Sequence, residues 1–306
     1  MPFHVIVGAG APALATARLL AEQGERVRLV SRRGVGVGAV AARELVEPVA
    51  LDANDTAALT DLTKGAATLF NCAAPAYHIW PQAAPPLFGS ILAAAERGAQ
   101  RYVMLGNLYG YGPVDGPVTE DLPLLAPGPK GRVRARLWQE AMTAHAAGRV
   151  RATELRAGQF LGAGAVSSFT LTVQPRVLAG ELALTPAAID SPTGYSAIED
   201  VAHALVTLAR QESAFGHAWH APATNATVRE VAGALARVAG APEPRLETLT
   251  DRDLALLALT SPIWGEFGET AHMSHRPFLV DSSRVAQAFG LKPTPLEESF
   301  AGQFAR

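Results

Sequence analysis

Short apolar runs rich in β-branched residues alternate with helical patterns through the first half of this chain, and this alternation limits the fold more than any other feature. Strands are predicted at 4–9, 26–31, 46–51, 67–72, 101–106 and 151–157. Helical patterns lie between them at 12–23, 55–63, 84–98 and about 130–147. Apolar strands separated by helices are typical of a parallel sheet with helices on both faces. We therefore predict an α/β fold with a doubly wound parallel sheet of the Rossmann type.

A glycine-rich turn joins the first predicted strand to the first predicted helix. In HVIVGAGAPALATARLL, the residues Gly8, Gly10 and Ala13 form a G-x-G-x-x-A pattern. Gly8 permits the tight turn, Gly10 lets the backbone approach a pyrophosphate, and the small Ala13 allows the helix to pack closely on the strand. The free N–H groups and positive dipole end of the helix then attract phosphate oxygens. The turn predicts a dinucleotide-binding site.

The end of the second predicted strand indicates which dinucleotide is preferred. It carries Ser31, Arg32 and Arg33 where a site for NAD usually offers an acid to the ribose 2′-hydroxyl. Arginine binds phosphate through paired hydrogen bonds, so these residues suit a 2′-phosphate. We therefore expect NADP(H) to be favoured over NAD(H).

The pattern changes after residue 157, where loops rich in Gly and Pro alternate with shorter helical stretches at about 199–211, 227–239, 251–259 and 282–288. We predict a dinucleotide-binding Rossmann domain over 1–157. Residues 158–306 are predicted to form mostly a smaller α/β substrate-binding lobe, with some segments returning to the Rossmann sheet.

Composition limits the class of partner. The net charge of the 306-residue chain is −2, which argues against nucleic acid and membrane surfaces, since these attract a basic face. Cys72 is the single cysteine, so an internal disulfide and a Cys-rich metal site are excluded, and His272 and His275 lack companion ligands at motif spacing. We expect a cytoplasmic protein that binds a small-molecule substrate and no metal. A homodimer is left open.

Several further stretches resemble the extended short-chain dehydrogenases/reductases of the NAD-dependent epimerase/dehydratase family, and together they cover nearly the whole chain. They are Asp52 after the third strand, NCAAP (71–75), NLYGYGP (107–113), TEDLPLLAPGPKGRVRARLWQE (119–140), YSAIEDVAHAL (195–205) and RPFLVDSSRVAQAFGLKPTPLEE (276–298). The resemblance implies cofactor in the first lobe, with Asp52 and Ala73 among the cofactor-binding positions, and substrate between the lobes.

The three catalytic residues usual in that family are missing. Its tyrosine position falls on Lys130, its lysine position on Arg134, and its serine position near Leu105 or Gly106. Arg134 could hydrogen-bond a ribose or phosphate of the cofactor, and Lys130 could donate a proton if its pKa were depressed. The competing interpretation is that Lys130, Arg132 and Arg136 form a solvated helix face.

Two other stretches offer replacements for the missing catalytic residues. Tyr109 and Tyr111 follow the fifth strand, so either hydroxyl could donate the proton, and Asn107 beside them could orient a substrate carbonyl. The expected loop 74–82 after the fourth strand adds further side chains where ligands bind in open α/β sheets. In it, Tyr77 and Trp80 are candidates for a substrate-binding wall and His78 is a candidate acid or base.

These observations support two hypotheses. The first is an NADP(H)-dependent oxidoreductase or epimerase-like enzyme with a non-standard active site, acting on a small, partly apolar substrate with a carbonyl or hydroxyl group. The second is a non-catalytic NADP(H)-binding redox sensor or scaffold, which the missing Ser, Tyr and Lys would suit. The sequence does not distinguish reduction from epimerisation.

Overall fold

The computed structural model describes residues 2–34 and 43–304, which divide into two compact units. Unit 1 comprises Met1–Asn107, Arg132–Arg156 and Val201–Trp219. Unit 2 comprises Leu108–Gly131, Ala157–Asp200 and His220–Arg306. The units are nearly equal in length, and each is assembled from segments far apart in the sequence.

A seven-stranded sheet forms the centre of unit 1. All of its residues belong to unit 1 except the last residue of β6 and the last residue of β10. Its order is β10-β6-β5-β4-β1-β2-β3, and the pairs β2–β3, β1–β2, β1–β4 and β4–β5 are parallel. The order reverses between β1 and β4, where doubly wound sheets bind ligands. The predicted fold class is thus confirmed. The strands are β1 (Phe3–Val7), β2 (Arg26–Ser31), β3 (Val46–Ala50), β4 (Thr68–Asn71), β5 (Arg101–Asn107), β6 (Arg151–Ala157) and β10 (Ala218–His220).

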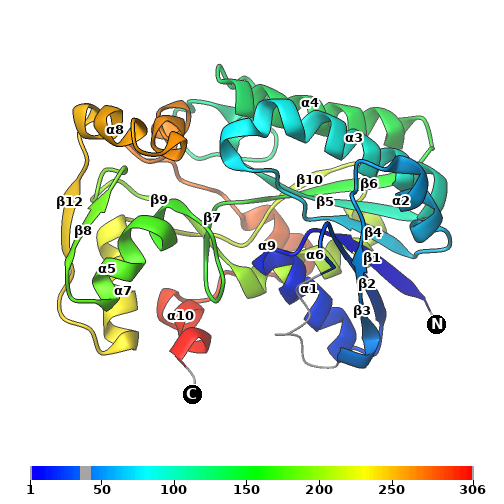
Figure 1. The fold of residues 1–306 in the computed structure, drawn as a ribbon, viewed down its shortest axis with the longest axis horizontal. Helices are drawn as coiled ribbons and strands as arrows, with labels where there is room; N and C mark the ends of the chain where they lie inside the picture. Colours follow the sequence, from blue (N-terminus) through cyan, green and yellow to red (C-terminus); the bar gives the residue numbers. More distant parts are fainter. Residues whose placement is uncertain (1, 35–42, 305–306) are drawn as a thin grey trace. The chain divides into compact units, whose positions relative to one another are not determined.

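Helices cover both faces of this sheet. In Figure 1, α3 and α4 lie over one face and α1 lies on the other. The helices α4 and α6 each begin with residues of unit 2 and continue in unit 1. The bounds are α1 (Ala11–Glu22), α2 (Thr56–Thr63), α3 (Trp80–Gly98), α4 (Pro129–Ala146) and α6 (Ile198–Arg210), with short 3-10 turns η2 (Arg43–Leu45), η3 (Tyr77–Ile79) and η6 (Glu212–Ala214).

Local sequence explains most of these elements. Buried apolar side chains along β1 suit a strand covered on both faces. The side chain of Asp55 accepts a hydrogen bond from the Ala58 N–H at 3.0 Å and so caps the start of α2. The core under α3 and α4 includes Leu69, Phe88, Ile91 and Tyr102.

One predicted loop is shorter than the sequence suggested. We expected a loop over 74–82 and a helix over 84–98. The structure instead has η3 followed directly by α3, which begins at Trp80 and includes Pro85 and Pro86. Both prolines lie beyond the first four positions of α3, so each leaves the helix without one internal backbone N–H donor.

Unit 2 contains two small sheets and several short helices. The strands β7, β9 and β11 form one sheet, in which β7–β9 is parallel and β9–β11 antiparallel, and β8 pairs with β12 in parallel. The strands are β7 (Gln159–Leu161), β8 (Leu182–Thr185), β9 (Thr193–Ala197), β11 (Thr224–Ala226) and β12 (Arg245–Thr248). The helical elements are η4 (Tyr109–Tyr111), η5 (Phe169–Val173), α5 (Gln174–Leu178), α7 (Val228–Ala239), α8 (Asp251–Ala258), η7 (Pro262–Glu266), η8 (Gly268–Met273), α9 (Ser283–Phe289) and α10 (Leu296–Phe304).

Two clusters of buried side chains stabilise unit 2. One packs Phe169, Tyr195 and Phe300 against α7. The other surrounds Tyr111 and Phe278. The helix α7 has a capping box between Thr227 and Glu230 and ends at a left-handed glycine, so its bounds agree with the predicted helix within one residue.

In the part of the chain that the structure describes, no helix combines the length and the apolar character needed to cross a membrane.

Candidate functional site

The turn after β1 has the geometry of a phosphate-binding turn. Gly8 has φ +123°, and a Cβ there would lie 2.5 Å from the carbonyl oxygen of Cys72, so only glycine fits. Gly10 precedes α1, and a Cβ at this exposed position would meet only Pro12, at 3.9 Å. Ala13, in the first turn of α1, is fully buried. A ligand can therefore approach the backbone at Gly10 closely, as a pyrophosphate requires.

The first turn of α1 offers free N–H groups to an anion, but not at every position. Ala11 and Ala13 carry N–H groups in this turn, whereas Pro12 between them has none. The residues present fit a dinucleotide. Because of Pro12, the start of α1 has one backbone N–H donor fewer than a helix start without proline.

The ends of β2 and β3 lie side by side. The Leu51 N–H donates to the carbonyl oxygen of Ser31 at 3.0 Å, which brings Ser31 close to Asp52. The Asp52 carboxylate accepts hydrogen bonds from the backbone and side-chain N–H groups of Asn54, and these lower its pKa, with a smaller contribution from Arg32. The side chains of Arg32 and Arg33 are both exposed in the turn that follows β2.

The end of β4 completes the cradle around Gly8. The Ala73 N–H donates to Oδ1 of the buried Asn71 at 3.1 Å, and Asn71 Nδ2 donates to the Tyr102 hydroxyl at 2.9 Å. The Cys72 N–H donates to the carbonyl oxygen of Val7 at 2.9 Å. Burial raises the pKa of the half-buried Cys72 thiol to about 12, so the thiol is protonated near neutral pH. The structure thus brings Gly8 and Ala73 together.

Arg134 lies on the inner side of α4, in unit 1. Its guanidinium lies 4.3 Å from the ring centre of Trp80 and 5.3 Å from that of Phe88, and Nη1 donates to the carbonyl oxygen of Leu105 at 3.3 Å. Only 8% of Arg134 is exposed. Trp80 is buried beside it, so the two predicted site residues meet in the interior of unit 1.

A buried ion pair fills the space beside the expected serine position. Glu154 and Arg156 on β6 are both buried, and Arg156 Nε lies 2.7 Å from Glu154 Oε2. A Cβ at Gly106 would lie 2.2 Å from Glu154 Oε1. The carboxylate of Glu154 therefore occupies the place that a side chain at Gly106 would take.

Lys130 is not part of a solvated helix face, so that interpretation is wrong for this residue. Only 2% of Lys130 is exposed, and Nζ forms ion pairs with Glu266 and, at 3.2 Å, with Glu269. Burial lowers the pKa of Lys130, but the hydrogen bonds to Glu266 and Glu269 outweigh it, so the pKa is raised. Lys130 therefore does not have the depressed pKa that we expected a proton-donating lysine to need. Arg132 and Arg136 are exposed.

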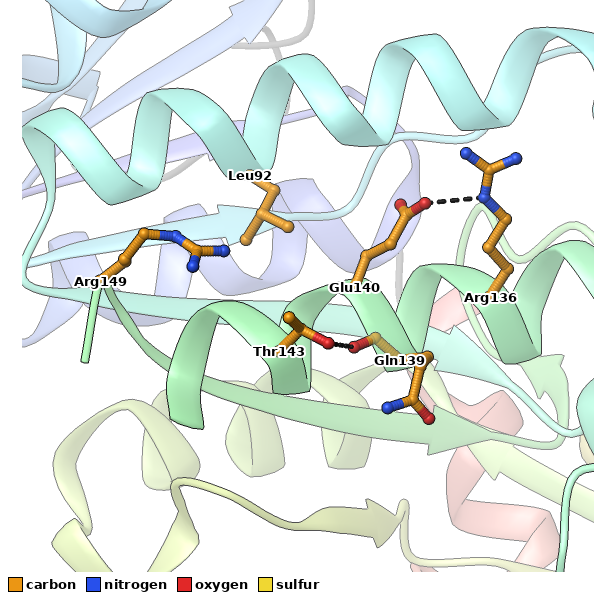
Figure 2. A pocket seen from close by; sticks show the side chains of 6 residues that line it. All are labelled: Leu92, Arg136, Gln139, Glu140, Thr143 and Arg149. Carbon is orange, nitrogen blue, oxygen red and sulfur yellow. Dashed lines mark hydrogen bonds and ion pairs between the residues drawn. The ribbon is translucent and has the colours of Figure 1, made fainter. Parts of the chain in front are cut away.

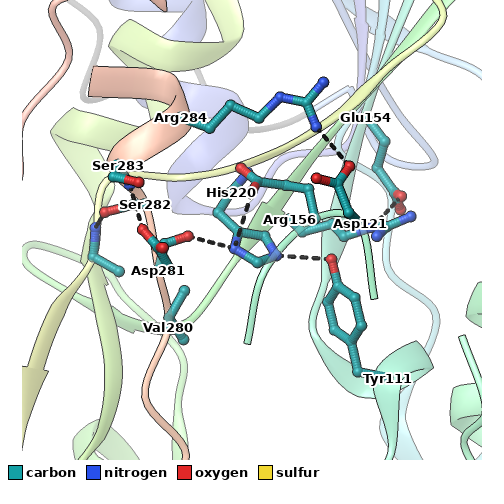
Figure 3. Close-up of polar contacts among 12 residues, drawn as sticks. Tyr111, Asp121, Glu154, Arg156, His220, Val280, Asp281, Ser282, Ser283 and Arg284 are labelled. Carbon is teal, nitrogen blue, oxygen red and sulfur yellow. Dashed lines mark hydrogen bonds and ion pairs between the residues drawn. The ribbon is translucent and has the colours of Figure 1, made fainter. Parts of the chain in front are cut away.

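Figure 3 shows the polar contacts around Tyr111 in unit 2. The Tyr111 hydroxyl lies 2.8 Å from His220 Nε2, and His220 Nδ1 lies 2.8 Å from the carbonyl oxygen of Asp281. The backbone N–H of His220 donates to Glu120 Oε1 at 2.9 Å. These contacts fix the η4 turn, which also carries Tyr109.

The remaining predicted residues lie at the ends of β4 and β5. Asn107 ends β5 and is half-buried, and Tyr109 follows it in η4, also half-buried. Tyr77 and His78 form η3, in which Tyr77 is half-buried and His78 exposed.

A surface hollow of unit 1 contains none of the predicted site residues. It has a volume of about 560 Å³ and lies on α3, α4 and the following loop (Figure 2). An ion pair between Arg136 and Glu140, with 2.7 Å between Nε and Oε1, spans part of it. The hollow is lined by Leu92, Arg136, Gln139, Glu140, Thr143 and Arg149.

Four residues of these contacts were not predicted as site residues from the sequence: Asn71, His220, Glu266 and Glu269. Glu266 and Glu269 lie more than 130 residues from Lys130 in the chain, and no motif links them. Asn71 at a strand end was the one available signal, because asparagine often turns the backbone through its own side chain. Among the described residues, no group of three or more His, Cys, Asp or Glu side chains is arranged to hold a metal ion.

Comparison with known proteins finds similarity only among solved structures. No family model matches the sequence, and no curated protein matches it. The epimerase Mth375 from Methanothermobacter thermautotrophicus is 16% identical with a TM-score of 0.80, over 97% of this chain and 90% of that one. MoeE5 in complex with UDP-glucose and NAD is 19% identical with a TM-score of 0.75, over 97% and 95%. The UDP-glucose 4-epimerase of Thermus thermophilus in complex with NAD is 16% identical with a TM-score of 0.75, over 97% and 96%.

The fold of these solved structures confirms the family resemblance that was drawn from the sequence. They also contradict the expected preference for NADP(H), because MoeE5 and the Thermus enzyme hold NAD. The two arginines on which that expectation rested lie in an exposed environment of mixed charge. Arg32 and Arg33 are exposed, and Arg32 lies near the carboxylate of Asp52, so this edge does not present guanidinium groups alone to a phosphate.

Proposed function

We propose that this chain is an NAD(H)-dependent enzyme of the oxidoreductase or epimerase-like type, with a non-standard active site. The observation that carries the proposal is the turn after β1. There Gly8 packs on the Cys72 carbonyl with no room for a side chain, while the space above Gly10 is open. Solved proteins of this fold that hold NAD support the choice of cofactor.

Each part of the cofactor has candidate partners in unit 1. The Ala11 and Ala13 N–H groups would hold the pyrophosphate, and Asp52 would accept hydrogen bonds at the adenosine end. Ala73 and Arg134 are the candidates near the nicotinamide end. When bound, NAD(H) supplies the hydride chemistry, so the protein has to position a substrate carbon and move a proton.

Tyr109 is the residue that we propose for proton transfer. It follows β5 and is half-buried, whereas Tyr111 is buried and hydrogen-bonded to His220. Lys130 is a poor candidate because its pKa is raised. In this proposal His220 is a positioning residue that acts through Tyr111 on the turn, and exposed His78 is the alternative acid or base.

The substrate that we propose is a small, partly apolar molecule with a hydroxyl or carbonyl group. MoeE5 is in complex with UDP-glucose and NAD, so nucleotide sugars are the second class of substrate to test. A redox-neutral epimerisation regenerates the cofactor within one cycle, while a net oxidation accumulates NADH. Absorbance of NADH therefore distinguishes the two reactions.

The first test is NADH binding by fluorescence titration with wild type and two valine variants. Gly10→Val should fold normally, because its Cβ meets no close neighbour and its φ of −77° is open to any residue. It should weaken NADH binding on the order of tenfold or more, because the side chain fills the space that the pyrophosphate needs. Gly302→Val, whose Cβ also meets nothing within 4 Å, is the matched control. Equal affinity in all three proteins would refute the proposed cofactor site.

The second test asks for turnover with NAD⁺, using a panel of secondary alcohols together with UDP-glucose and UDP-glucuronic acid. Formation of NADH, or conversion of a UDP-sugar without it, would support the enzyme. Tyr109→Phe should then reduce the rate on the order of 10²-fold, as the loss of a general acid or base does. An unchanged rate would move the proton transfer to His78.

A non-catalytic NAD(H)-binding sensor or scaffold is the second candidate. The specific observation in its favour is that Leu105 and Gly106 stand at the expected serine position, while Lys130 at the tyrosine position is locked in ion pairs. Tight NADH binding without turnover of any compound in the panel would select this function.

A further inference from the structure

A segment of unit 2 that follows β12 is weakly packed for its composition. Residues 251–276, which we call the cap segment, contain α8, η7 and η8, and none of their side chains is buried. Apolar residues are nevertheless common in it. Leu256 is 54% exposed and Leu259 is 85% exposed, and Trp264 and Phe267 contact each other with ring centres 5.8 Å apart while staying half-exposed.

The cap segment is attached to the start of α4 through two carboxylates. Glu266 and Glu269 form ion pairs with the buried Nζ of Lys130. Glu269 Oε1 also accepts hydrogen bonds from the backbone N–H groups of Lys130, at 2.6 Å, and Gly131, at 3.2 Å. One carboxylate thus satisfies two free donors at a helix start and neutralises part of a buried charge.

The local sequence of α4 is adapted to this attachment. A Cβ at Gly128 would lie 2.3 Å from Glu269 Cγ, so a side chain there would displace the carboxylate. A Cβ at Gly131 would lie 2.6 Å from the carbonyl oxygen of Tyr109. The attachment point is therefore in direct contact with the turn that carries the proposed proton-transfer residue.

The other links between the cap segment and the rest of unit 2 are weaker. The Ala188 N–H donates to the carbonyl oxygen of Ser274 at 3.0 Å, close to the end of the segment. Arg276 Nη1 lies 3.8 Å from the exposed Asp115, and exposed ion pairs of this kind contribute little. The cluster of Lys130, Glu266 and Glu269 is consequently the main polar attachment of the middle of the segment.

We propose that the cap segment is a lid, held closed on the start of α4 by Lys130 through Glu266 and Glu269, and that release of these carboxylates uncovers the region beside Tyr109. Few buried side chains and one main charged attachment among the described residues are the properties of a segment that opens without unfolding its unit. The role of the lid in admitting substrate rests on the proposed function, whereas its opening does not.

Hydrogen–deuterium exchange measured by mass spectrometry on the full chain tests the lid. The variant Glu266→Gln/Glu269→Gln keeps the shape of both side chains and removes their charge. We expect amides of the cap segment to exchange about tenfold faster or more than in wild type, because local opening becomes more frequent, and amides away from the cap segment, the start of α4 and the turn with Tyr109 should be unchanged. The matched control Asp190→Asn/Glu297→Gln removes two carboxylates from exposed ion pairs elsewhere in unit 2, and it should leave the cap segment unchanged.

Lys130→Met provides an independent variant and should give the same local acceleration. If it fails to fold, the glutamine variant decides the question. Unchanged exchange in the cap segment of the glutamine variant, or acceleration of equal size throughout the chain, would overturn the lid. Failure of wild type to bind NADH would refute the proposed function and would leave the exchange result valid.

Discussion

The hydroxyl of Tyr111 lies 2.8 Å from Nε2 of His220, and both side chains are buried in unit 2. The direction of this hydrogen bond follows from the other side of the imidazole ring. The carbonyl oxygen of Asp281 only accepts, so His220 Nδ1 carries the proton that it receives. In the neutral form of the ring Nε2 then accepts this hydrogen bond and Tyr111 donates it.

Tyr111→Phe should destabilise the protein, because it leaves a buried nitrogen of His220 without this donor. We expect the free energy of unfolding to fall by about 1–3 kcal/mol, measured by urea denaturation. Tyr195→Phe is the control, since Tyr195 is equally buried and its hydroxyl has no hydrogen-bond partner among the described residues. It should not lower the stability, because no hydrogen bond of the hydroxyl is lost. Similar losses in both variants would mean that ring packing, and not the hydrogen bond, was measured.

Gly8→Ala should be far more damaging than alanine at another glycine with positive φ. Gly65 has φ +79° and open space around its Cβ position, so Gly65→Ala should cost about 1–2 kcal/mol from backbone strain alone. At Gly8 the added Cβ also meets the Cys72 carbonyl at 2.5 Å. We expect an additional loss of at least about 2 kcal/mol, together with loss of NADH binding. Equal stability of the two variants would contradict the close approach of β1 and β4 at this turn.

Pro12→Ala should strengthen NADH binding. It restores an N–H donor in the first turn of α1, and one hydrogen bond contributes about 0.5–1.5 kcal/mol, equivalent to roughly a 2- to 12-fold gain in affinity. Isothermal titration calorimetry measures the change. Pro175→Ala, an exposed proline in the first turn of α5, is the control and should leave affinity unaltered. Weaker binding by Pro12→Ala would show that the proline ring itself shapes the turn.

Cys72 should be inert in the native protein and should make stability fall at high pH. Its folded pKa of about 12 lies above the model-compound value of 9.0, so the unfolded state loses its thiol proton first. The contribution of this group is fully present below pH 9 and is lost as the pH rises toward 12. Ellman's reagent at pH 8 should react with the urea-unfolded chain and not with the folded one. Rapid labelling of the folded protein would place the thiol at the surface.

Six of the seven strands in the sheet of unit 1 were predicted from the alternation of strand-like and helical stretches, and β2 and β6 agree with the predicted ranges at both ends, whereas β10 was not predicted. The strands of unit 2 were missed for a physical reason. β7 and β11 have three residues each, too few for a period of two to emerge from surrounding loops. Their pairing depends on contacts between segments distant in sequence, such as Thr224 with Tyr195.

In the candidate site, too, features set by local sequence were predictable and features set by the tertiary fold were not. Gly8, Gly10 and Ala13 follow one another in a motif with a local mechanism, so the sequence is enough to identify the turn. The environment of Lys130 depends on Glu266 and Glu269, which reach it only through the tertiary fold, and its burial and raised pKa were therefore beyond prediction. The preference for NADP(H) was wrongly predicted from Arg32 and Arg33, because residues at a strand end do not reveal whether their side chains face a ligand or water.

The carboxylate of Glu154 beside Gly106 limits which substitutions this position accepts. Any side chain introduced at Gly106 would begin 2.2 Å from Glu154 Oε1, so the carboxylate would have to move. Replacing Glu154 would instead remove the ion-pair partner that Arg156 has on β6. A serine hydroxyl cannot therefore be introduced at this position without disturbing a buried ion pair.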